Sequence, residues 1–104
     1  MAYKSTLAAL SDPTRRAVFE RIVKAPRSVG EIAEGMPISR PAVSQHLKVL
    51  REAGLVQEER QGTQRIYSAD AKALGDLRAY VDQMWQAALG KFAESADRSK
   101  GRKR

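Results

Sequence analysis

Apolar residues in the first third of the chain recur every three or four positions, which is the period of an amphipathic helix. This pattern predicts a short helix over residues 4–10 and a second helix over residues 13–24. Asp12 and Pro13 supply a start for the second helix. An aspartate at this position accepts from free backbone N–H groups, and a proline in the first turn loses no hydrogen bond.

Two further helices follow before the midpoint of the chain. Ser28 and Glu31 have the spacing of a capping box, which predicts a short third helix that ends near Gly35. A fourth helix is predicted over residues 39–53, with a serine as its N-cap and Gly54 as its left-handed stop. The third and fourth helices are separated only by a short turn that contains a proline.

The spacing of apolar residues changes in the second half of the chain. Residues 55–60 and 64–68 predict two strands of a β-hairpin with a glycine in the turn. From about residue 70 to 93 the helical period returns, as the longest apolar stripe in the chain. The polar residues 95–104 predict a disordered basic tail. The sequence therefore predicts one folded domain over residues 1–94, mainly helical with a small hairpin.

Composition narrows the class of protein. With 104 residues, 42% of them hydrophobic, the chain suits one small soluble domain. It has no apolar run near the ~18 residues of a membrane span, and no signal-peptide core, so we expect a cytoplasmic protein. The absence of cysteine excludes disulfides and thiolate metal sites.

The net charge of +7 is mainly a property of the C-terminal end. Five of the nineteen basic residues lie within positions 98–104, and the others barely outnumber the twelve acidic residues. Such a tail either attracts nucleic acid without regard to sequence or is simply solvated. Net charge alone is therefore a weak argument for a nucleic-acid partner.

The fourth helix has two distinct faces. Val43, Leu47 and Leu50 share one face at spacings of four and three, which predicts that they are buried. The opposite face carries arginine, serine, glutamine and lysine. In a major groove, arginine can form two hydrogen bonds with the edge of guanine, and glutamine can form two with the edge of adenine. Lysine neutralises phosphate. The alternative is an ordinary solvated helix face.

This chain resembles the ArsR/SmtB family of transcriptional repressors. Residues 39–56, SRPAVSQHLKVLREAGLV, with residues 60–62 and Tyr67, are similar to the recognition helix and wing of that family. Residues 10–16, LSDPTRR, are similar to its opening signature, and the resemblance covers residues 4–93. It implies a winged helix-turn-helix of order α-α-α-α-β-β-α, a homodimer through the terminal helices and repression of transcription.

The resemblance and the helix face together give a set of candidate DNA-binding residues. In the fourth helix they are Ser39, Arg40, Pro41, Ser44, Gln45, His46 and Lys48, and in the hairpin Arg60, Thr63, Gln64 and Arg65. For His46 the spacing also indicates a partly buried helix residue. For the hairpin arginines the alternative is pairing with Glu58 or Glu59. Arg15 and Arg16 either touch phosphate, form a salt bridge or are solvated.

The apolar stripe of the last helix is longer than a domain of this size can cover with its own core. We expect part of it to face a second copy of the chain. The candidate dimer-interface residues are Tyr3, Leu7, Leu10, Leu77, Val81, Met84, Trp85, Leu89 and Phe92. Met84 and Trp85 either belong to the interface core or border a pocket for an effector, whose identity the residues do not indicate.

Metal and enzyme functions are not expected. Asp70, Asp76 and Asp82 have no histidine or cysteine nearby to complete a transition-metal site, so no metal or other cofactor is predicted. No catalytic arrangement is evident with a single histidine. The chain is thus predicted to bind double-stranded operator DNA as a homodimer, without a membrane partner. The alternatives are a winged-helix module for protein–protein interaction and a non-specific nucleic-acid binder.

Overall fold

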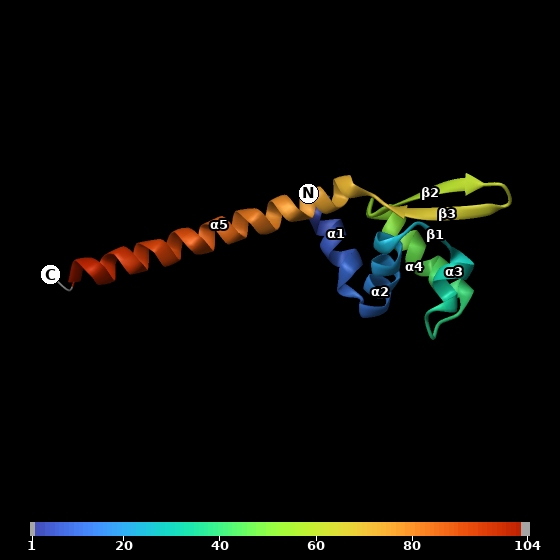
Figure 1. The fold of residues 1–104 in the computed structure, drawn as a ribbon, viewed down its shortest axis with the longest axis horizontal. Helices are drawn as coiled ribbons and strands as arrows, with labels where there is room; N and C mark the ends of the chain where they lie inside the picture. The colour runs from blue at the N-terminus through green and yellow to red at the C-terminus, as the bar shows by residue number, and fades with distance from the viewer. Residues whose placement is uncertain (1, 103–104) are drawn as a thin grey trace.

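The computed structural model describes the backbone of residues 2–102 and the side chains of residues 4–96. Its elements are α1 (Ala2–Ser11), α2 (Pro13–Lys24), β1 (Arg27–Ser28), α3 (Val29–Glu34), α4 (Arg40–Glu52), β2 (Val56–Gln61), β3 (Gln64–Ala69) and α5 (Ala71–Arg102). Figure 1 shows α1 to α4 and the sheet gathered at one end, with α5 extending from them as a long arm. The predicted mainly helical fold with a small hairpin is confirmed.

The predicted helix starts are made by the predicted side chains. Asp12 accepts a hydrogen bond of 2.9 Å from the N–H of Arg15, the third residue of α2. Ser28 and Glu31 form a reciprocal capping box at the start of α3. Ser39 accepts a hydrogen bond of 3.2 Å from the N–H of Ala42, the third residue of α4. These boundaries were predictable because each depends on residues within one turn of the chain.

The Asp12 cap leads to a pH-dependent stability. The N–H of Arg15, which donates to this carboxylate, lowers the pKa of Asp12. A lowered pKa means that folding favours the ionised form, so this stabilisation is complete above the unfolded pKa of about 4 and is lost as the pH falls through the folded pKa. We expect the urea midpoint to fall as the pH drops below about 4, and to fall less steeply in Asp12→Asn, which keeps a capping oxygen but does not titrate. An equally steep fall in that variant would contradict this prediction.

The sheet has one strand more than the pattern predicts. Its order is β1-β3-β2, and both pairings are antiparallel. The added strand, β1, is only two residues long and pairs Arg27 with Tyr67 and Ser28 with Ile66. A two-residue strand has no detectable period, so its pairing with a segment almost forty residues away could not be read locally. It fixes the start of α3 against the hairpin.

The hairpin turn depends on one glycine. Gln61 and Gln64 are the last paired residues, so Gly62 and Thr63 form a two-residue loop. Gly62 has a φ of +64°, in the left-handed region that glycine adopts without strain, and Thr63 does not have a positive φ. This combination fits a type II′ turn, which matches the twist of the flanking strands.

One hydrophobic core lies among the first four helices and the sheet. Its fully buried apolar members come from α2, α3, α4 and the residue just before β2: Val18, Ile22, Ile32, Val43, Leu47, Leu50 and Leu55. The predicted inward face of the fourth helix is confirmed, because Val43, Leu47 and Leu50 are all at most 1% exposed. Leu10 and Leu74 pack against the edge of this core.

The last helix is longer than the apolar pattern predicts. We expected it to end near Ala93, with residues 95–104 as a disordered tail, but α5 continues to Arg102. The spacing of apolar residues indicates which part of a helix is buried, and it does not indicate how far the helix extends. Adding residues to an existing helix also avoids the cost of nucleation. The residues after position 93 include good helix formers and no proline. None of the described helices is long and apolar enough to span a membrane.

Candidate nucleic-acid interface

The helix α4 presents a row of polar side chains outward. Arg40, Ser44, Gln45 and Lys48 are all exposed, on the side opposite the buried face. Pro41 is also exposed in the first turn, whereas the hydroxyl of Ser39 is already used as the N-cap. The helix α3 packs against α4, so the two form a helix-turn-helix with α4 as the outer member.

Arg40 lies close to the helix α3. A β-carbon added at Gly30 would be 3.2 Å from the Nη2 atom of Arg40, which places the guanidinium over the first turn of α3. This end of α4 borders a hollow of about 460 Å³ whose wall also contains Ser44, Arg65 and Tyr67. The absence of a side chain at Gly30 therefore leaves room for Arg40 beside the outward face of α4.

The hairpin places two arginines opposite each other. Arg60 and Arg65 are cross-strand partners, and Glu58 and Tyr67 form the next such pair on the same face of the hairpin. Both arginines are exposed, as are Thr63 and Gln64 near the tip. Like charges in direct opposition disfavour the free hairpin, so an anion between them would stabilise it.

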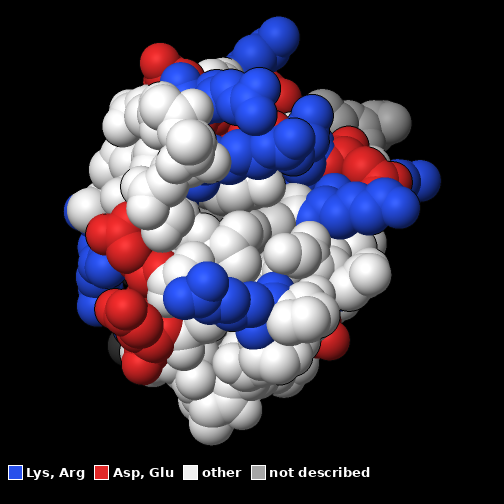
Figure 2. Space-filling model, turned by 90° about the vertical axis from the view of Figure 1, so that its right-hand side faces the viewer, with Lys and Arg blue, Asp and Glu red and all other residues white. Residues whose placement is uncertain are grey.

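An open hollow of about 520 Å³ separates the hairpin from α4. It is lined by Ser44, Lys48, Arg51, Glu52, Glu58, Arg65 and Tyr67. Figure 2 shows this end of the molecule, with Lys and Arg gathered over its upper part and acidic side chains along the left edge and among the basic ones at the upper right. Three of the candidate residues, Ser44 and Lys48 of α4 and Arg65 of the hairpin, therefore line one hollow.

Glu58 is at the centre of the ionic contacts of this hollow. Its Oε2 atom lies 2.9 Å from Nη1 of Arg51 and accepts a hydrogen bond of 3.1 Å from the hydroxyl of Tyr67. Its Oε1 atom lies 3.5 Å from Nη1 of Arg65. Burial, and then the hydrogen bond to Glu58, raise the pKa of Tyr67, so its hydroxyl stays protonated and donates at neutral pH. The sequence suggested pairing of a wing arginine with Glu58 but not the role of Arg51 or Tyr67.

The structure places His46, Arg15 and Arg16 against other parts of the protein. His46 is half-buried on the flank of α4, as its spacing predicts, and its charge makes a minor contribution to the lowered pKa of Asp12. Arg15 donates to the carbonyls of α1 at Ala9 and Ala8, at 2.5 and 3.2 Å. Arg16 donates to the carbonyl of Leu10 at 2.7 Å. The two arginines therefore cap the end of α1, an arrangement not among the alternatives considered from the sequence.

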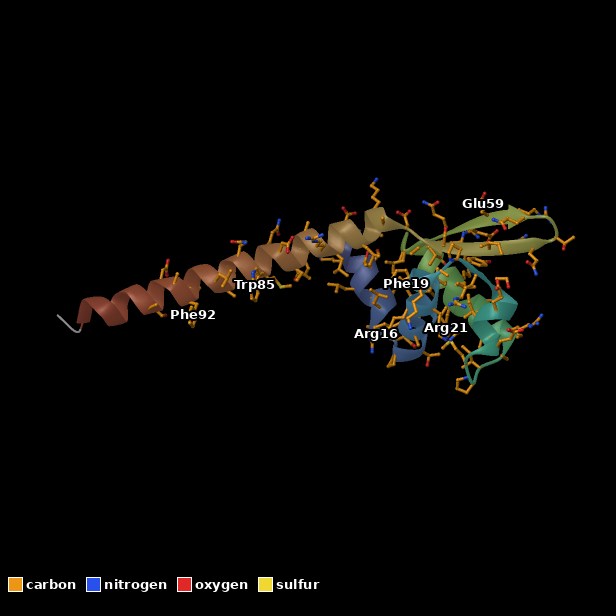
Figure 3. The ribbon with its side chains drawn as sticks, viewed as in Figure 1. Arg16, Phe19, Arg21, Glu59, Trp85 and Phe92 are labelled. Carbon is orange, nitrogen blue, oxygen red and sulfur yellow. The ribbon has the colours of Figure 1, made fainter. Side chains whose placement is uncertain are left out.

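The candidate dimer residues divide into two groups. Leu10 and Leu77 are half-buried, whereas Leu7, Val81, Met84, Trp85, Leu89 and Phe92 are large and exposed. Trp85 is 61% exposed and Phe92 is 76% exposed. Figure 3 shows both on the part of α5 that projects away from the other helices. Tyr3 lies outside the residues whose side chains are described.

The acidic and histidine side chains of residues 4–96 do not form a metal-binding group. Among the residues with described side chains, no group of three or more could hold a metal ion. Asp70 instead accepts hydrogen bonds from the side chain of Gln57 and the N–H of Lys72, both at 2.9 Å. These two donors lower the pKa of Asp70.

A helix-turn-helix followed by a hairpin, with a polar outer helix, defines the winged helix-turn-helix class of DNA-binding proteins. A family model described as a helix-turn-helix domain matches residues 10–59. The HTH-type transcriptional regulator Rv2034 of Mycobacterium tuberculosis is 49% identical over 89 residues, which are 86% of this chain and 83% of that protein. The chain belongs to the ArsR/SmtB family of DNA-binding transcriptional regulators.

Two further relatives agree with this assignment. The transcriptional repressor SdpR of Bacillus subtilis is 37% identical over 68 residues, 65% of this chain and 76% of that protein. The solved structure of an ArsR-like transcriptional regulator from Rhodococcus sp. RHA1 superposes with a TM-score of 0.76 at 29% identity, over 88% of this chain and 89% of that one. The predicted family and fold class are thus confirmed.

Proposed function

We propose that this regulator is a homodimeric repressor that binds a palindromic operator. The outward face of α4 enters the major groove, with Arg40 and Gln45 on base edges and Lys48 on phosphate. The hairpin reaches the adjacent backbone or minor groove through Arg60 and Arg65. Bound in this way over a promoter, the protein excludes the polymerase.

One observation carries this proposal. Ser44 and Lys48 of the exposed row of α4 line one open hollow with Arg65 of the hairpin, and Arg40 and Ser44 line a neighbouring hollow with Gln64 and Arg65. Side chains that hydrogen-bond to bases and side chains that neutralise phosphate are therefore adjacent, which is the combination that DNA readout needs. The names of the related regulators agree with this function.

The dimer in this proposal is supported by the apolar face of α5. Exposed large apolar side chains at spacings of three and four mark an interaction surface rather than a solvated helix. Leu7 on α1 is also exposed, and α1 packs against α5. Twofold pairing through these helices would present two copies of α4 to half-sites about one DNA turn, ~34–36 Å, apart.

The proposal is tested by fluorescence anisotropy on tiled duplexes from the region upstream of the gene, against a shuffled duplex. We expect tight binding to one imperfect palindrome with two chains per site, and a steep loss of affinity as salt rises. Equal binding to every duplex, abolished by deletion of residues 98–104, would favour a non-specific binder. No binding to any duplex would favour a protein–protein interaction module.

A further inference from the structure

Glu58 is the last partly buried side chain of β2 before the tip of the wing, the hairpin of β2 and β3. Every residue from position 59 to 65 is exposed, so nothing in this stretch is buried against the rest of the protein. Glu58, which precedes it, has a side chain only 18% exposed and is the last residue of β2 with partly buried contacts. The direction of the outer hairpin therefore depends on what holds Glu58, together with the pairing of β3 with β1 at Ile66 and Tyr67.

What holds Glu58 comes from two different elements. Arg51 belongs to the last turn of α4, whereas Arg65 and Tyr67 belong to β3. The one carboxylate contacts all three groups, at 2.9, 3.5 and 3.1 Å. Tyr67 is buried in the core, so the hydrogen bond from its hydroxyl fixes the carboxylate relative to the body of the protein.

The contacts of Glu58 with Arg51 and Arg65 also reduce the positive charge of the surface that would face DNA. Arg51 and Arg65 are 56% and 61% exposed and line the hollow between α4 and the hairpin. Without a carboxylate beside them, both would attract phosphate of any sequence. Base contacts specify a site, whereas phosphate contacts add affinity to every site, so neutralising these arginines favours specificity.

We propose that Glu58 is a positioning residue of the DNA interface, whose carboxylate orients the wing relative to α4 and restrains Arg51 and Arg65 from indiscriminate phosphate contact. This inference rests on the proposed DNA-binding function. It predicts that Glu58 limits affinity for random DNA while it maintains preference for the operator.

The chain offers a matched control at the next position. Glu59 is exposed and lies on the face of β2 opposite to Glu58. Glu59→Gln removes the same charge as Glu58→Gln. Figure 3 shows Glu59 on the outer side of the hairpin. Glu58→Gln retains the size of the side chain and an oxygen that accepts from Tyr67, so the core contact is preserved. Equal thermal midpoints of the two variants would verify that both are folded.

The first readout is DNA binding. Glu58→Gln is expected to bind a shuffled duplex up to about tenfold more tightly near 0.1 M salt, and its slope of log K against log salt is expected to steepen by about 1. Its ratio of operator to shuffled affinity is expected to fall. Glu59→Gln should remain close to the unchanged protein in slope and ratio.

The second readout needs no DNA. Because the chain has no cysteine, spin labels attach only at introduced sites, here Gln45→Cys on α4 and Thr63→Cys at the hairpin tip. Labelled chain diluted with unlabelled chain gives one intramolecular distance by pulsed electron resonance. We expect a narrow distribution in the unchanged background and in Glu59→Gln, and a broader or shifted one in Glu58→Gln.

The two readouts together decide the proposal. Glu58→Gln must differ from Glu59→Gln in both, and a difference in neither or in only one overturns the combined role. If the unchanged protein itself prefers no duplex, the proposed function fails, and the label distances alone then show whether Glu58 positions the wing.

Discussion

Trp85→Glu is expected to separate the dimer into monomers and to weaken binding to the complete operator by about 10²–10⁴-fold. Trp85 is large, 61% exposed and central to the apolar face of α5. A carboxylate at this position would be buried without a partner in a twofold interface, which is strongly unfavourable. A monomer would contact one half-site instead of two, so the gain in affinity from binding both half-sites at once would be lost.

Sedimentation velocity measures the first effect and fluorescence anisotropy on the operator the second. Gln83→Glu is the matched control, because Gln83 lies about half a turn from Trp85, is exposed and introduces the same charge. It should remain dimeric with unchanged affinity. A Trp85→Glu protein that sediments as a dimer would show that this face of α5 is not the dimer interface.

Gln45→Ala is expected to weaken operator binding by about 5- to 150-fold, equivalent to ~1–3 kcal/mol, with little change on a shuffled duplex. Gln45 is exposed on α4 and caps no helix, so its removal leaves the fold intact. Arg40→Ala should have a similar effect. Lys48→Ala should instead weaken binding to both duplexes alike and reduce the salt slope by about 1.

Anisotropy titrations of these variants on both duplexes at several salt concentrations separate the two kinds of contact. Gln86→Ala serves as the control, since this glutamine is exposed on α5 and belongs to neither α4 nor the hairpin. An operator preference that survives both Gln45→Ala and Arg40→Ala would exclude α4 as the element that reads bases. A Lys48→Ala effect confined to the operator would move Lys48 from phosphate to a base edge.

Local chemistry was enough to predict most of the fold. The start of each of α2, α3 and α4 follows from a capping side chain that accepts a hydrogen bond from an N–H three residues further on. The buried face of α4 follows from the spacing of its apolar residues. The strand β1 and the full length of α5 were missed for opposite reasons. Pairing of Arg27 and Ser28 with β3 is non-local, while the end of α5 has helix-forming residues without an apolar pattern.

The candidate site was predictable only as far as one helix determines it. The exposed row from Arg40 to Lys48 follows from the period of α4 alone. The cluster around Glu58 requires α4, β2 and β3 to meet, and no spacing in the sequence signals it. The role of Arg15 and Arg16 at the end of α1 likewise depends on how two helices cross, so charge alone could not distinguish it from a phosphate contact.

The length of α5 makes its first turn a mechanical pivot. At ~1.5 Å per residue, its 32 residues form a lever of about 48 Å, so a tilt of about 10° at the base moves the far end by about 8 Å. That base is held by the Asp70 amide, which donates to the carbonyl of Leu55 at 2.8 Å, and by Gln57, which donates to the Asp70 carboxylate. Angular stiffness at this base, to which the packing of α1 against α5 also contributes, therefore governs how accurately one end of the molecule is oriented by a contact made at the other.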